Sequence, residues 1–73
     1  MPNAALQLES SVEFVDPIDP SRRVLGTLCR INNQTGFCCV QFVDIGCRKV
    51  HRSHLVPSTQ QGPSCTDDCR QGC

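Results

Sequence analysis

Hydrophobic and polar residues alternate in short runs along this chain, and residues that favour turns follow each run. The strongest run, residues 37–43, places Cys38, Val40 and Phe42 on one face of an extended segment. Residues 11–15 show the same alternation on a smaller scale. A period of two residues is typical of half-buried β-strands, so the pattern predicts strands here.

Further short extended elements are expected downstream of each turn. Residues 23–31 should form a strand with a β-bulge, because their apolar positions do not alternate strictly. Residues 47–51 should form a short strand. A single helical turn is expected at residues 53–55, followed by an edge element at residues 56–57 whose proline cannot donate to a ladder.

Residues with special backbone preferences separate these segments. Pro17 and Pro20 fix φ and remove two donors, which predicts a stiff loop. Residues 32–36, Asn-Asn-Gln-Thr-Gly, have hairpin-turn chemistry. Gly46 closes a tight turn and permits a left-handed conformation there. A meander of this kind buries its apolar face by curling into a small barrel, which Leu55 would seal at one end.

The order of residues across positions 12–57 resembles a Tudor domain. Three segments carry the resemblance: Gly26-Thr27-Leu28, then Phe42-Val43-Asp44-Ile45-Gly46, and after a strand centred on Val50, Leu55-Val56-Pro57. The resemblance implies an all-β fold, a small SH3-like or Tudor-like barrel of four to five antiparallel strands with flexible termini. We expect residues 1–10 to be a flexible N-terminus, residues 11–57 to be the barrel, and residues 58–73 to be a polar linker with a cysteine-bearing tail.

The resemblance also implies a ligand-binding surface. Tudor domains that bind methylated arginine or lysine hold the cation in a cage of aromatic rings, each worth about 0.5–2 kcal/mol. The cage-equivalent surface of this chain comprises Arg23, Val24, Phe42, Ile45 and Cys47. The cage aromatics are missing and Arg23 would repel a cation, so we expect the reading of methyl marks to be impaired. Phe14 and Phe37 remain candidates for one cage wall.

We therefore expect a non-catalytic protein-interaction module, acting in recognition or scaffolding in nuclear or ribonucleoprotein assemblies. The expected partner is a protein or peptide, the expected state is a monomer, and no cofactor is expected. A catalytic nucleophile needs a general base nearby and a residue that orients this base. The sequence shows no such arrangement, so no catalytic activity is expected. No apolar run approaches the roughly 20 residues that cross a bilayer, so no membrane contact is expected.

A basic strip suggests an alternative function. The formal net charge is zero, but the middle of the chain is basic, and its densest part comprises Arg48, Lys49, His51, Arg52 and His54. Such a run can be a solvated strand face, an RNA contact or a contact with an acidic peptide. Known RNA-binding surfaces usually add aromatic rings for base stacking, and none is interleaved here.

The seven cysteines can be interpreted in two ways. Their odd number, and an N-terminus without the features of a signal peptide, favour a reducing cytoplasmic or nuclear compartment with mostly free thiols. Cys65, Cys69 and Cys73 share the spacing of one helix face, on a helix that Pro63 and Ser64 could start. They could hold zinc with a fourth ligand from Cys47, His51 or His54. The spacing lacks the usual zinc-knuckle pattern, so no metal is expected.

Overall fold

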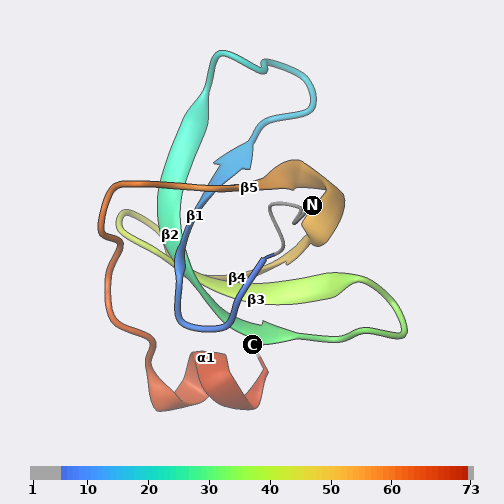
Figure 1. Ribbon diagram of the computed structural model, residues 1–73, viewed down its shortest axis with the longest axis vertical. Coiled ribbons are helices and arrows are strands. Elements are labelled where there is room, and N and C mark those ends of the chain that lie inside the picture. Colours follow the sequence, from blue (N-terminus) through green and yellow to red (C-terminus); the bar gives the residue numbers. More distant parts are fainter. Residues whose placement is uncertain (1–5, 73) are drawn as a thin grey trace, which may run out of the picture.

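The computed structural model describes residues 6–72, which form an all-β domain with one short helix (Figure 1). Its elements are β1 (Ser11–Val15), β2 (Arg23–Ile31), β3 (Phe37–Phe42), β4 (Gly46–His51), the 3-10 turn η1 (Arg52–His54), β5 (Leu55–Pro57) and α1 (Asp67–Gln71). The five strands form one sheet in the order β4-β3-β2-β1-β5, and all neighbours are antiparallel. The all-β fold class is confirmed. The sheet has β4 and β5 as its edges, and its closure into a barrel stays a prediction.

The strand positions expected from the hydrophobic pattern are close to those observed. β1 and β2 have the predicted bounds, and the register of β2 against β3 shifts between Leu28 and Arg30, where a bulge was expected. The turn before β4 begins at Val43, one residue earlier than predicted. Gly46 has a φ of 78°, the left-handed value that the turn chemistry predicts. The expected flexible N-terminus, residues 1–10, falls partly outside the described residues.

The main core fills the inner face of the sheet. It consists of Val12, Leu28, Cys38, Val40, Phe42 and Leu55, all buried. The alternation in β3 therefore points inward as predicted. Leu55 comes from the edge strand β5 and belongs to the same buried cluster as the residues of the central strands.

The centre of β2 is crowded on both sides by other segments. A Cβ atom at Gly26 would lie 2.6 Å from Val40 Cγ1 and 2.9 Å from Phe42 Cδ1. A Cβ atom at Gly62 would lie 2.7 Å from the carbonyl oxygen of Gly26. The core side chains of β3 and the backbone after β5 therefore both lie close to β2 at Gly26, which has no side chain.

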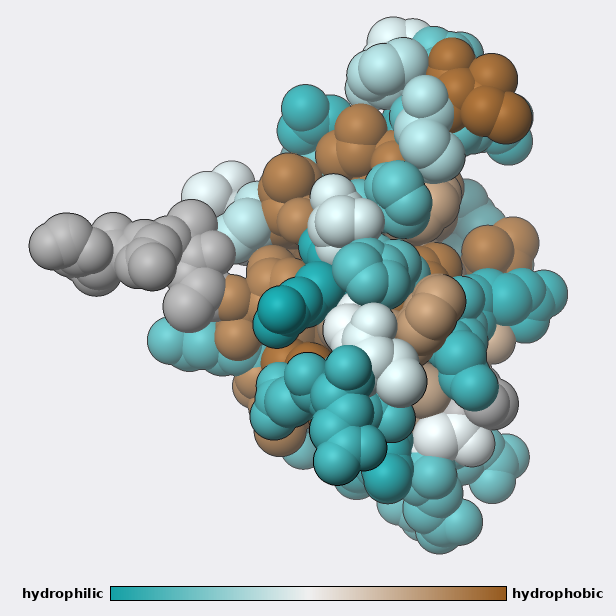
Figure 2. All heavy atoms as spheres, turned by 90° about the vertical axis from the view of Figure 1, so that its right-hand side faces the viewer, coloured by the Kyte–Doolittle hydropathy of each residue, from teal (hydrophilic) through white to brown (hydrophobic). Residues whose placement is uncertain are grey.

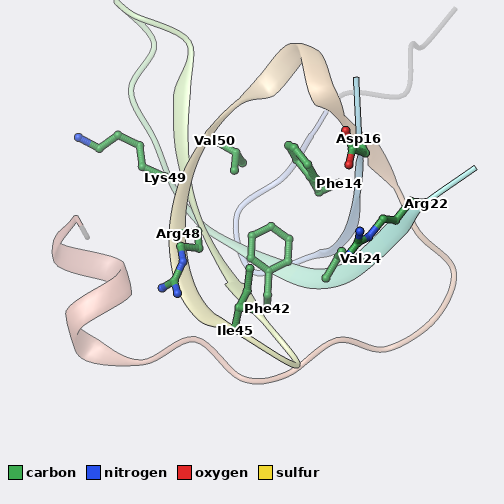
Figure 3. Close-up of a pocket in the computed structure, with 9 residues that line it drawn as sticks. All are labelled: Phe14, Asp16, Arg22, Val24, Phe42, Ile45, Arg48, Lys49 and Val50. Atoms are coloured by element: carbon green, nitrogen blue, oxygen red, sulfur yellow. The ribbon is translucent and has the colours of Figure 1, made fainter. Parts of the chain in front are cut away.

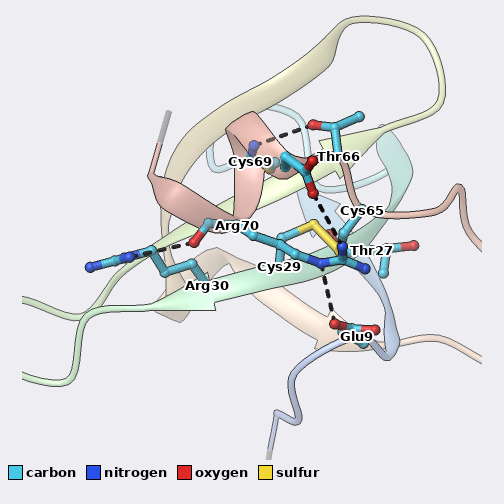
Figure 4. Close-up of polar contacts among 9 residues, drawn as sticks. Glu9, Thr27, Cys29, Arg30, Cys65, Thr66, Cys69 and Arg70 are labelled. Atoms are coloured by element: carbon cyan, nitrogen blue, oxygen red, sulfur yellow. Dashed lines mark hydrogen bonds and ion pairs between the residues drawn. A yellow bond between two sulfur atoms is a disulfide. The ribbon is translucent and has the colours of Figure 1, made fainter.

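The C-terminal segment is bonded to the sheet, which differs from the expected tail. Disulfides join Cys29 to Cys65 and Cys47 to Cys69, with Cα–Cα distances of 5.7 and 5.6 Å (Figure 4 shows the first). The expectation of mostly free thiols is therefore wrong for these four cysteines. The physical reason is that alternate residues of a strand point to opposite faces of the sheet. Cys29 and Cys39 form a second small cluster with Cys69 on the face opposite the main core, and Cys47 and Cys65 pack against this cluster.

Polar contacts add to this attachment. Thr66 caps α1, since its hydroxyl accepts from the Cys69 N–H at 3.2 Å (Figure 4). Thr27 donates its hydroxyl to the carbonyl of Pro63. Arg70 forms an ion pair with Glu9 at 3.3 Å, so the helix also contacts the segment before β1. We call residues 58–72 the C-terminal clasp.

Candidate functional site

A pocket of about 440 Å³ opens on the domain, and all its lining residues come from positions 14 to 50. Its apolar lining consists of Phe14, Val24, Phe42, Ile45 and Val50. Its charged lining consists of Asp16, Arg22, Arg48 and Lys49. The volume lies within the range of pockets that hold small ligands or single side chains.

Two phenylalanine rings form the base of this pocket. Phe14 on β1 and Phe42 at the end of β3 meet edge to face, with ring centroids 6.2 Å apart and an interplanar angle of 81°. Phe14 also contacts the imidazole ring of His54, with the two ring centroids 5.9 Å apart. Phe42 is only 3% exposed, so it is mainly a core residue. The pocket therefore offers an apolar floor rather than several ring faces around one point.

Charged groups surround this floor, and positive charge predominates. In Figure 3 the Lys49 side chain extends away from the two rings, while Arg22 and Arg48 lie on opposite sides of them. The single carboxylate, Asp16, accepts the backbone N–H groups of Ile18 at 2.9 Å and Asp19 at 3.4 Å. Arg22 and Arg48, against one partly engaged carboxylate, make the rim suitable for an anionic group.

The structure gathers three of the five residues predicted for the cage-equivalent surface. Val24, Phe42 and Ile45 line the pocket. Arg23 does not line it but forms an ion pair with Glu13 at 3.4 Å. Cys47 is bonded to Cys69, so its sulfur is not available to a ligand.

Six lining residues lie outside the five-residue cage-equivalent surface. Phe14 was considered as a possible cage wall, Arg48 and Lys49 were assigned to the basic strip, and Asp16, Arg22 and Val50 were not among the five. The positions of Phe14 and Arg22 relative to Val24 indicate that both belong to this surface. Phe14 pairs with Val24 in the β1–β2 ladder, and Arg22 lies two residues before Val24. Alternation in an extended segment places Arg22, and not Arg23, on the side of Val24. Phe37, the other candidate wall, packs instead against His51 at 5.1 Å.

The basic strip is divided among different surroundings. Arg48 and Lys49 lie at the pocket. His51 contacts Phe37 and also the hydroxyl of Ser53, at 2.9 Å from Nδ1. Arg52 lies at a separate hollow beside Leu6. The strip therefore does not form one continuous cationic surface.

The thiol of Cys38 belongs to the core. Burial raises the pKa of Cys38, and the nearby charge of Arg52 lowers the pKa only in part. A raised pKa keeps the thiol protonated, which opposes a role as nucleophile.

Two of the three tail cysteines considered as zinc ligands form disulfides instead. Cys65 and Cys69 are in disulfides and supply no thiolate, and Cys73 lies outside the described residues. Over residues 6–72, no group of three or more His, Cys, Asp or Glu side chains is placed to hold a metal ion. Within the same residues, no helix has the length and apolar character needed to span a membrane.

Comparison of the chain with protein-family models, curated proteins and solved structures finds no match.

Proposed function

We propose that this chain is a non-catalytic interaction module whose pocket binds a protein segment that presents one apolar side chain beside carboxylates. The observation that carries this proposal is the combination of an apolar floor with a rim that holds two arginine side chains, Arg22 and Arg48. An aliphatic side chain would bury its surface against Phe14, Val24 and Val50, at about 25 cal/mol per Å² of apolar area. Carboxylates beside it would lie near Arg22 and Arg48.

The same arrangement opposes a methylated arginine or lysine. A cation in the pocket would meet the like charges of Arg22 and Arg48 and the edge-to-face pair of Phe14 and Phe42. The favourable cation–π contact depends on access to ring faces, and Phe42 is nearly fully buried. A Tudor-like module with this pocket would therefore select anionic segments.

The disulfides bear on where the module acts. Cytoplasmic or nuclear location stays a prediction, and the two disulfides argue against it, because such bonds persist mainly in oxidising compartments. A protein-interaction role does not depend on this point, since the pocket residues are outside the clasp.

A binding experiment with three short peptides tests the proposal. One peptide carries isoleucine between aspartates, the second carries isoleucine between lysines, and the third carries a dimethylated arginine. We expect binding of the first, weakened by added salt, and little binding of the other two. Preference for the dimethylated peptide would overturn the proposal.

A pair of variants locates the binding. Arg48→Glu should weaken binding of the aspartate peptide by about three- to tenfold, since it reverses one rim charge. Arg52→Glu is the matched control, because Arg52 is exposed and lies away from the pocket. Equal losses in both variants would indicate a nonspecific charge effect. RNA binding with a steep salt dependence would instead support the alternative drawn from the basic strip.

A further inference from the structure

The loop between β1 and β2 presents an isolated aliphatic side chain to solvent. Ile18 is 92% exposed, more than any other large hydrophobic residue in the described part of the chain. Figure 2 shows a hydrophobic surface among hydrophilic residues at the top of the molecule, where Figure 1 places this loop. A single exposed apolar residue needs no explanation by itself. The surroundings of Ile18 are what give it meaning here.

Hydrogen bonds and prolines hold this loop in one shape. Asp16 accepts two backbone N–H groups of the loop, and the N–H of Arg22 donates to the carbonyl of Asp19 at 2.9 Å. Pro17 and Pro20 flank Ile18 and Asp19 and fix their own φ angles. A segment that is already rigid loses little conformational entropy when it binds.

The loop has the chemistry that the pocket fits. Ile18 lies between Asp16 and Asp19, so it is an aliphatic side chain beside carboxylates. The pocket offers an apolar floor with Arg22 and Arg48 at its rim. Because Ile18 is almost fully exposed, it does not occupy the pocket of its own chain.

We propose that a second copy of this chain is a ligand of the pocket, with Ile18 of each copy inserted into the pocket of the other. Asp19 of one copy would lie near Arg48 of the other. This inference rests on the proposed function of the pocket. It departs from the monomer expected from the sequence.

The position of the β1–β2 loop next to the pocket favours a closed dimer. Asp16 and Arg22 belong both to the base of the loop and to the lining of the pocket, so the two parts are neighbours. One two-fold axis beside them can bring both loops to both pockets at once. Such an interface uses the same surface twice and leaves no open site for a third copy.

Sedimentation equilibrium over a concentration series reaching the millimolar range tests the dimer. We expect a reversible monomer–dimer equilibrium. Ile18→Ser should raise the dimer dissociation constant by at least about tenfold, because each dimer loses two buried aliphatic side chains. The exposure of Ile18 means that this substitution leaves the fold intact. Leu8→Ser is the matched control, an exposed leucine outside the loop and the pocket, and should leave the equilibrium unchanged.

The same variant separates this inference from the proposed function. Ile18→Ser keeps every pocket residue, so it should still bind the aspartate-flanked isoleucine peptide. If the chain stays monomeric at the highest concentration, or if Ile18→Ser dimerises as well as the unmodified chain, the inference is wrong, and peptide binding decides the pocket's function separately. If neither a second copy nor the peptide binds, both proposals fail.

Discussion

Cys65 is bonded to Cys29 across 36 residues of sequence, and this bond holds the C-terminal clasp against β2. The second bond, between Cys69 and Cys47, fastens α1 to β4. A domain of this size buries a limited part of its surface, so covalent links of this kind contribute much of the stability of small domains.

Reduction of the two disulfides should therefore destabilise the domain. Each bond closes a loop of 22 or more residues, which the chain-entropy view equates with about 3–4 kcal/mol, although the two effects need not add. We expect thermal unfolding followed by circular dichroism to shift to clearly lower temperature after treatment with a phosphine reductant. An unchanged transition would show that the clasp adds no stability.

The thiol of Cys38 should react only when the domain opens. Its burial blocks access, and its raised pKa leaves less thiolate at any given pH than an ordinary cysteine has. Alkylation with iodoacetamide, followed by mass spectrometry of the peptides, should label Cys38 slowly in the folded chain and rapidly in denaturant. Equally fast labelling in both states would contradict its placement in the core.

The same pKa shift gives a pH dependence of stability. Above the ordinary thiol pKa of 9.0 the unfolded chain loses the Cys38 proton while the folded chain retains it. The contribution of this thiol is therefore fully present below that pH and decreases as pH rises beyond it. Denaturant unfolding of the unmodified chain and of Cys38→Ala should show that this loss at alkaline pH is smaller in the variant.

A side chain at Gly26 should destabilise the sheet. A Cβ atom there would meet Val40 and Phe42 at less than 3 Å, so Gly26→Ala should cost about 1–3 kcal/mol through overpacking. Gly46→Asn is the control, because no atom lies within 4 Å of its Cβ position and asparagine tolerates positive φ. In denaturant unfolding, Gly26→Ala should have a clearly lower free energy of unfolding than Gly46→Asn. The reverse order would contradict the close approach of β3 to Gly26.

Loss of the side chain that covers the core should have a comparable or larger effect. Leu55 is buried among core residues, so Leu55→Ala should lower the free energy of unfolding by about 2–5 kcal/mol. Leu8→Ala, at an exposed position, should change it by no more than about 0.5 kcal/mol. Similar midpoints for the two variants in urea would show that Leu55 does not seal the core.

The strands could be predicted because their information is local. Alternation in β3 and the turn chemistry at Gly46 depend on neighbouring residues, and both have the expected geometry. The β2 bulge also followed from a break in the local pattern.

The clasp could not be predicted because its partners are distant in sequence. Cys65 and Cys69 were expected on one face of a helix, but Cys65 lies before α1, and only the folded sheet brings Cys29 and Cys47 next to these two cysteines. The helix is also shorter than the cysteine spacing suggests, since α1 begins after its Thr66 cap and ends before Gly72. Part of the pocket could be predicted: Val24, Phe42 and Ile45 followed from the resemblance, whereas the position of Phe14 beside Val24 required the β1–β2 register.

The most direct test of the pocket's function is a titration of the ¹⁵N-labelled chain with the aspartate-flanked isoleucine peptide, followed by amide chemical shifts. The titration uses Ile18→Ser, so that self-association does not compete. We predict saturable shifts centred on Val24, Ile45 and Val50, with the amides of the clasp little changed. Shifts centred instead on Phe37 and Arg52, or no saturable shift at all, would contradict the account.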